Sequence, residues 1–148
     1  MKILSQNKKA HFNFEILEKF EAGISLLGQE VKSLKKWGVN LGGGYIIIKN
    51  NEAFLTGIDI PPWQQNNIGG NYNTKRDRKL LLKKEEIRYL IGKSKQKGFF
   101  LVPLKLYTKG GKIKLEFAVA KIKKKFQKKE LIKKREIERE IQRALKEY

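Results

Sequence analysis

Two hairpin signals constrain the fold of this chain more than any other feature of its sequence. Asn50-Asn51 follows a β-branched run, and Lys109-Gly110-Gly111 separates two further strand-like segments. Asn and Gly readily adopt the left-handed backbone that tight hairpin turns require. The four expected strands are 45–48, 53–60, 99–107 and 112–120. Two antiparallel hairpins favour a mainly β protein.

Two other segments show the apolar spacing of short helices. Residues 30–37 end before Gly38, and residues 83–97 end before Gly98; glycine is the usual residue just after a helix. Short strands separated by helices predict a curled sheet or small barrel with two or three flanking helices. The preferred form is an OB-like barrel of five or six strands.

The N-terminal signals are weaker. Residues 1–10 are expected to form a polar arm, and residues 12–16 alternate apolar and polar side chains as a half-buried strand does. A second apolar segment follows at 24–27, with a turn or bulge expected at 20–23. Residues 64–74, rich in Asn, Gln and Gly, are expected to form a surface loop.

The charge of the chain restricts its partners. There are 34 Lys and Arg residues against 15 Asp and Glu, a formal net charge of +19. An excess of this size is usually neutralised by a polyanion, which could be nucleic acid, an anionic membrane surface or an acidic protein. No apolar run approaches the roughly 20 residues of a membrane-spanning helix, and the N-terminus lacks the apolar stretch of a signal peptide. We therefore expect a cytoplasmic protein.

Few residues in this chain can perform catalysis or bind metal. The chain has no Cys, and its single histidine, His11, has no partner for a metal site. No serine lies in a nucleophile motif. The run Gly42-Gly43-Gly44 lacks the Lys-Ser/Thr that follows in a phosphate-binding loop. We expect no catalytic residues, no metal, no cofactor and no enzymatic activity.

The composition changes after Ala120. Residues 121–148 contain 12 Lys and Arg and 5 Glu, a net charge of 12 − 5 = +7 in 28 residues. The first 120 residues carry 22 basic and 10 acidic groups, or +12. Apolar residues recur in the tail at helical spacing, but the stripe is too thin for a stable isolated helix. We expect a body over 1–120 and a tail over 121–148 that is disordered when free and helical on its partner.

Clusters of basic residues also occur at four places in the body. They are Lys8-Lys9, Lys32-Lys35-Lys36, Lys75-Arg76-Arg78-Lys79 and Lys93-Lys95-Lys97. Each phosphate that a cation neutralises releases condensed counterions, so several clusters together favour RNA. Aromatic residues near them, including Trp37 and Trp63, could stack on unpaired bases.

Several ordered motifs resemble the small protein B family. They are Asn7-Lys8-Lys9-Ala10, Phe20-Glu21-Ala22-Gly23, Gly28 through Leu34, Arg78 through Leu82, and Leu101 through Tyr107. The resemblance continues into the tail and covers residues 7 to about 145. It implies an OB-like barrel that binds the tRNA-like domain of transfer-messenger RNA and delivers it to stalled ribosomes for trans-translation.

The resemblance also implies which residues bind RNA. Asn7, Glu21 and Leu81 match the family's RNA-contacting positions, although Leu81 could instead be a core leucine and Glu21 could fix a turn. The full predicted interface is Asn7, Lys8, Lys9, Glu21, Glu30, Lys32, Arg76, Arg78, Lys79 and Leu81.

The tail is expected to probe the A site and decoding centre of the ribosome, where the mRNA channel is empty. Its predicted contacts are Lys124, Lys125, Lys128, Lys129, Lys133, Lys134 and Arg135. Gln127 stands where the family usually has Asp. The expected assembly is a monomer within a ribonucleoprotein complex. The alternative function is a ribosomal or ribosome-assembly protein that binds rRNA structurally.

Overall fold

The computed structural model describes residues 1–63, 72–123 and 138–143. Residues 138–143 are helical, and the other elements follow in chain order. They are β1 (Lys2–Gln6), α1 (Lys8–Asn13), β2 (Phe14–Ile24), α2 (Gly28–Trp37), β3 (Tyr45–Lys49), β4 (Glu52–Thr56), β5 (Arg78–Leu81), α3 (Lys84–Ser94), β6 (Phe99–Lys109) and β7 (Lys112–Ile122).

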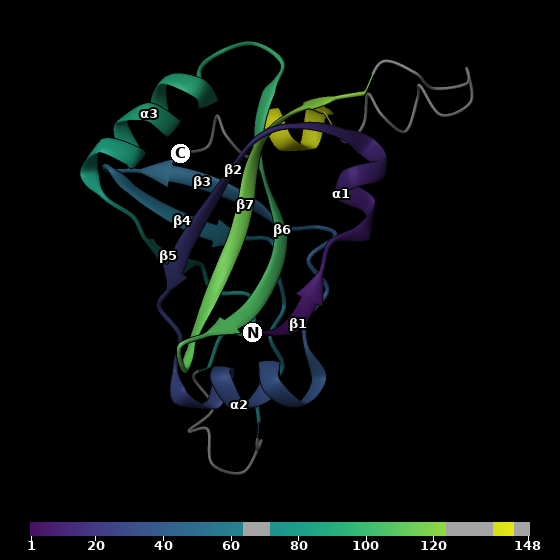
Figure 1. Cartoon of the computed structure of the whole chain (residues 1–148), viewed down its shortest axis with the longest axis vertical. Helices are drawn as coiled ribbons and strands as arrows, with labels where there is room; N and C mark the ends of the chain where they lie inside the picture. Colours follow the sequence, from purple (N-terminus) through teal and green to yellow (C-terminus); the bar gives the residue numbers. More distant parts are fainter. Residues whose placement is uncertain (64–71, 124–137, 144–148) are drawn as a thin grey trace.

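All seven strands belong to one antiparallel sheet, in the order β1-β6-β7-β2-β5-β4-β3. The sheet curls, because β3 at one edge also contacts β6 near the other edge. The described residues form no ladder that closes β1 onto β3. Helices α2 and α3 lie at opposite ends of the curled sheet (Figure 1). The predicted mainly β, OB-like fold with short flanking helices is confirmed, with seven strands in place of five or six.

Both hairpins form where the sequence predicts them. Asn50 and Asn51 have φ angles of 52° and 60°, and Gly110 and Gly111 have 61° and 77°. Two consecutive positive φ angles match the twist of the flanking strands. The first hairpin is shorter than expected, because β4 ends at Thr56 and does not continue to residue 60.

The main core lies inside the curl of the sheet. Ile46, Leu55 and Phe117 are completely buried there. The helices close its ends, α2 with Leu34 and α3 with Leu90. This packing confirms the existence of the two helices predicted from apolar spacing, and Gly38 ends α2 with a φ of 69°. Helix α3 is shorter than predicted, because it ends at Ser94 and does not continue to Gly98.

A second apolar cluster contains Ala10 of α1, Phe14 and residues of β6 and β7, with Ile141 packed against it. Strand β6 contributes to both clusters because its side chains alternate between the two faces of the sheet, with Leu101 in the main core and Val102 in the second cluster. A register shift between Pro103 and Lys105 then exchanges the two faces. Leu104 packs in the second cluster and Leu106 in the main core, whereas in a regular strand both would share one face.

The N-terminal predictions are wrong in three places. The expected polar arm contains β1, which pairs with β6, and α1. The expected strand at 12–16 begins only at Phe14, while Phe12 lies exposed on α1. Residues 20–23 lie within β2 and form no turn; the irregularity of this strand falls between Ile16 and Glu18. The type and bounds of these N-terminal elements depend on their packing against distant strands, which the local pattern of the sequence does not reveal.

Within the described ranges, no helix is long and apolar enough to cross a membrane. The same residues contain no group of three or more His, Asp or Glu side chains that could hold a metal ion.

Candidate nucleic-acid interface

Leu81 lies on the surface beside the end of β2. The pairing of β2 with β5 places Gly23 opposite Leu81. A Cβ atom on Gly23 would lie 3.3 Å from both Cβ and Cδ1 of Leu81, so glycine allows the leucine to lie against the strand. Leu81 is 58% exposed, which excludes the reading of this residue as a core leucine.

Two hollows meet at Leu81, and lysines line both. One contains Lys79, Lys83 and Lys114 together with the acidic residues Glu21, Glu52 and Glu86. The other contains Lys35, Lys112 and again Lys114. We call the residues Glu21, Gly23, Lys79, Leu81, Lys83, Lys112 and Lys114 the Leu81 surface. A solvent-exposed apolar side chain with lysines on both sides suits a polyanion that also offers sugar or base faces.

Glu21 is the acidic member of this surface. The Tyr107 hydroxyl donates a hydrogen bond to its carboxylate, and Lys109 Nζ lies 3.3 Å from its Oε2. The hydrogen bond from Tyr107 lowers the pKa of Glu21, assisted by Lys109 against a smaller desolvation effect. Burial, followed by the neighbouring Glu21 carboxylate, raises the pKa of Tyr107. Glu21 is therefore held as an anion with its other lone pairs open to solvent.

Glu30 forms a second charged cluster, and this one is buried. Glu30 and Arg78 are both 0% exposed. Arg78 donates to Glu30 Oε2 from Nε at 3.0 Å and from Nη2 at 2.6 Å. Arg76 donates to both carboxylate oxygens, and the Leu27 amide donates to Oε1 at 2.8 Å. The Tyr72 hydroxyl lies 2.9 Å from Oε2. We call Glu30, Tyr72, Arg76 and Arg78 the Glu30 cluster.

The Glu30 cluster ties the segment before β5 to the start of α2. Burial by itself raises the pKa of Glu30, but the hydrogen bonds from Arg76, Leu27 and Arg78 outweigh it and leave the pKa lowered. Arg78 also donates to the carbonyls of Arg76, at 2.6 Å, and Thr74, at 2.8 Å. Neither Glu30 nor Arg78 presents a side-chain surface to a partner, whereas the Arg76 side chain is 31% exposed.

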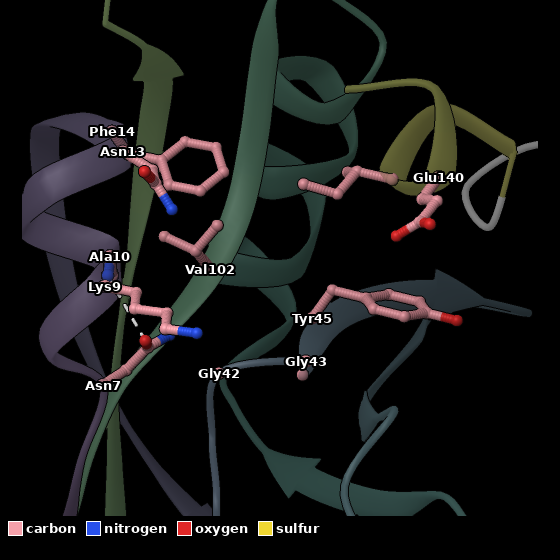
Figure 2. Close-up of a pocket in the computed structure, with 12 residues that line it drawn as sticks. Asn7, Lys9, Ala10, Asn13, Phe14, Gly42, Gly43, Tyr45, Val102 and Glu140 are labelled. Atoms are coloured by element: carbon pink, nitrogen blue, oxygen red, sulfur yellow. Dashed lines mark hydrogen bonds between the residues drawn. The ribbon is translucent and has the colours of Figure 1, made fainter. Parts of the chain in front are cut away.

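Asn7 is also largely buried. Its side-chain oxygen caps α1 by accepting from the Ala10 amide at 3.3 Å, and its Nδ2 donates to the Pro103 carbonyl at 2.9 Å. It lines a hollow between α1, the Gly42–Gly44 loop and the helix at 138–143 (Figure 2). Asn7 therefore fixes α1 on β6, while Lys8 and Lys9, which follow it, are exposed.

Comparison with known proteins decides the family. Residues 4–147 match the family model described as SmpB protein. The chain belongs to the SmpB family. It is 48% identical over 147 residues to the SsrA-binding protein of Trichodesmium erythraeum, covering 99% of this chain and 94% of that protein. The SsrA-binding protein of Caldicellulosiruptor saccharolyticus is 49% identical over 148 residues, covering 100% and 93%.

A solved SmpB-family structure has the same fold. It is described as "tmRNA-SmpB: a journey to the center of the bacterial ribosome". It aligns with a TM-score of 0.67 at 41% identity, covering 84% of this chain and 87% of that chain.

The structure brings together some of the sequence-predicted site residues and separates others. Glu21, Lys79 and Leu81 share one surface, and Lys79 also pairs with Glu52 at 3.1 Å. Lys32 is exposed on α2. The tail residues predicted to contact the ribosome lie outside the described residues. They are Lys124, Lys125, Lys128, Lys129, Lys133, Lys134 and Arg135.

Sequence reasoning missed three lysines of the Leu81 surface: Lys83, Lys112 and Lys114. Lys112 and Lys114 alternate along β7 directly after the Gly110-Gly111 turn, and Lys114 pairs with Gly23. A period-2 run of cations beside a hairpin turn was the available signal, because such residues share one face of a strand.

Proposed function

We propose that this SmpB-family protein binds the tRNA-like domain of transfer-messenger RNA and delivers it to stalled ribosomes in the cytoplasm for trans-translation. The names of its relatives, SsrA-binding proteins, support this RNA as the partner. The description of the related solved structure, which names tmRNA and the bacterial ribosome, supports the destination. The observation that carries the proposal is exposed Leu81 between two lysine-lined hollows.

Each member of the Leu81 surface has a separate task in this proposal. The lysines neutralise phosphates and release counterions. Leu81 packs on a sugar or an unstacked base, which a charged side chain cannot do without losing hydration. The negative charge of Glu21 repels phosphate, so its carboxylate contacts RNA only by accepting a hydrogen bond from a base or a 2′-hydroxyl.

Asn7, Glu30 and Arg78 act as positioning residues in the proposal. Their polar atoms are occupied by protein partners, so they contribute to RNA binding by holding α1 and the start of β5 in place. Lys8, Lys9 and Lys32 add exposed charge outside the Leu81 surface, and Arg76, which is paired with Glu30, is only partly exposed.

The basic tail makes the ribosomal contacts, at the A site and decoding centre. Seven cations between 124 and 135 suit rRNA phosphates. The protein works as a monomer in the ribonucleoprotein complex and contributes no catalytic group, cofactor or metal.

A binding comparison tests the recognition step. The full chain should bind the tRNA-like domain far more tightly than an rRNA duplex of equal length at physiological salt. Charge alone does not distinguish these two RNAs, so the difference isolates shape and base contacts. Equal affinities would contradict the proposal and favour a structural rRNA-binding protein.

A tail variant tests the delivery step. Deletion of the tail would also remove Ile141, which packs against the second apolar cluster. Replacing the seven tail cations with Gln leaves Ile141 in place. This variant should bind the tRNA-like domain nearly as well as the parent but fail in a reconstituted assay with stalled ribosomes. Loss of binding to the free RNA would show that the tail serves recognition instead.

A further inference from the structure

Two tryptophans pair at the end of α2. Trp37 is the last residue of this helix, and Trp63 lies in the segment after β4. Their ring centroids are 5.3 Å apart with an interplanar angle of 43°. Trp37 is 54% exposed. The pair therefore holds a large aromatic face open to solvent.

The pair is separate from the apolar clusters that stabilise the fold. Among the described residues, the main core and the second cluster include neither Trp37 nor Trp63. Indole rings are largely buried on average in folded proteins, and here the two rings contact each other. Large exposed apolar surfaces of this kind mark sites of interaction.

The exposed charged side chains of α2, the helix that ends at Trp37, are all lysines. Lys36 Nζ lies 5.5 Å from the centroid of the Trp63 ring, in cation–π range. Lys32 and Lys35 are also exposed on α2. The only acidic residue of this helix, Glu30, is completely buried and paired with two arginines. The exposed charge of α2 is thus entirely cationic. It favours a polyanion as the partner over a protein surface that has few acidic residues.

We propose that Trp37 and Trp63, with Lys32 and Lys36, form a second RNA site that takes an unpaired base of a single strand. Nucleobases stack on aromatic rings regardless of sequence, while nearby lysines neutralise the phosphates that flank the stacked base. The site goes beyond the proposed function, because it requires neither the tRNA-like fold nor the Leu81 surface.

The composition of the chain makes this site easy to observe. Trp37 and Trp63 are the only two tryptophans in the chain, so intrinsic tryptophan fluorescence reports on this site alone. Titration of the full chain with a short oligouridylate should quench the emission to saturation. Labelled oligouridylate should show a loss of affinity of roughly 5- to 150-fold for Trp37→Leu, the range that stacking of one base supports. Trp37→Phe should retain most of the affinity.

Two controls separate this site from the Leu81 surface and from general charge. Leu81→Ala should weaken binding of the tRNA-like domain and leave oligouridylate affinity unchanged. The double variant Lys32→Gln/Lys36→Gln, which retains both rings, should weaken oligouridylate binding and reduce its salt dependence. This variant also keeps the proposal testable should Trp37→Leu fail to fold.

Equal oligouridylate affinity for the parent and a folded Trp37→Leu variant would overturn the proposal. Equal quenching by polyglutamate would also overturn it, since polyglutamate is a polyanion that the lysines attract but has no base to stack, and charge alone would then account for the binding. If oligouridylate binds as expected but the tRNA-like domain does not, the proposed function fails while this site stands. If the tRNA-like domain binds but oligouridylate does not, the proposed function stands and the tryptophan site is overturned.

Discussion

The Leu81 surface and the Glu30 cluster each contain a glutamate paired with cations, but in opposite environments. Glu21 is exposed and bonded to Tyr107 and Lys109. Glu30 is completely buried and bonded to two arginines and a backbone amide. An exposed ion pair contributes little to stability. Removal of one partner of a buried ion pair strongly destabilises the protein, because the other charge is left buried without a counter-charge or water.

The difference separates two ways in which a motif residue can serve RNA binding. Glu21 is available for contact, and its exposed ion pair contributes little to the stability of the fold. Glu30 is unavailable for contact, and the path of the chain into β5 depends on it. Because β5 carries Leu81, the buried cluster positions the exposed surface.

The largest expected effect is on stability, through Glu30. Glu30→Ala leaves Arg78 buried without its anion, and we expect a loss of about 3–5 kcal/mol in the free energy of unfolding. Urea denaturation at neutral pH measures this loss. The matched control, Glu21→Ala, should leave the unfolding midpoint nearly unchanged. Similar midpoints for the two variants would remove the distinction between the clusters.

Leu81→Ala should have the converse profile. Shortening an exposed leucine removes little from the folded state, but it removes apolar area that the RNA would bury. At ~0.8 kcal/mol per buried methylene, the Kd for the tRNA-like domain should rise by about tenfold or more. Leu17, 41% exposed on β2, provides the control. If Leu17→Ala weakens binding as much as Leu81→Ala, the Leu81 surface is misplaced.

Lys114→Gln should change the salt dependence more than the specificity. Loss of one phosphate contact should lower the magnitude of the slope of log K against log salt by about 0.7–0.9. Lys95, which follows α3 and lines neither hollow at Leu81, is the control, and Lys95→Gln should leave the slope unchanged. An unchanged slope for Lys114→Gln would mean that this lysine does not meet phosphate.

The smallest effect concerns the ionisation of Glu21. Its lowered pKa means that the carboxylate stabilises the fold above its ordinary value of 4.5, and that this contribution is lost as the pH falls through the lowered value. Tyr107→Phe removes the largest cause of the shift, so the pKa of Glu21 should rise towards 4.5. An NMR titration of the carboxyl carbon measures it. An unchanged pKa would show that Tyr107 does not hold the carboxylate.

Local signals in the sequence were sufficient for the hairpins, α2 and α3. The left-handed turns at Asn50-Asn51 and Gly110-Gly111 and the apolar spacing of the helices depend on neighbouring residues alone. They also defined a mainly β fold, since two hairpins and their helices fill most of the body.

Elements that depend on distant partners could not be read in this way. β5 was missed because its pattern alternates buried Arg78 and Leu80 with exposed Lys79 and Leu81. A buried arginine fits a strand pattern only if its partner is known. Here the partner is Glu30, 48 positions earlier in the chain, which accepts a hydrogen bond from Arg78. β1 likewise depends on its pairing with β6.

The same limit applies to the candidate site. Family motifs identified Glu21 and Leu81 together with Glu30 and Arg78, but they did not distinguish exposed residues from buried ones. Lys114 joins the Leu81 surface only through the register of β2 with β7, which places it opposite Gly23. Register is set by the whole sheet, so these cations could be assigned only from the structure.

Amide hydrogen exchange of the full chain, with and without the tRNA-like domain, tests whether the Leu81 surface binds this RNA. We expect slowed exchange at the end of β2, in β5 and around the turn between β6 and β7, where the Leu81 surface lies. Leu81→Ala should reduce this protection. Protection confined to regions away from these three segments, with none at Leu81, would show that the RNA binds elsewhere on the protein.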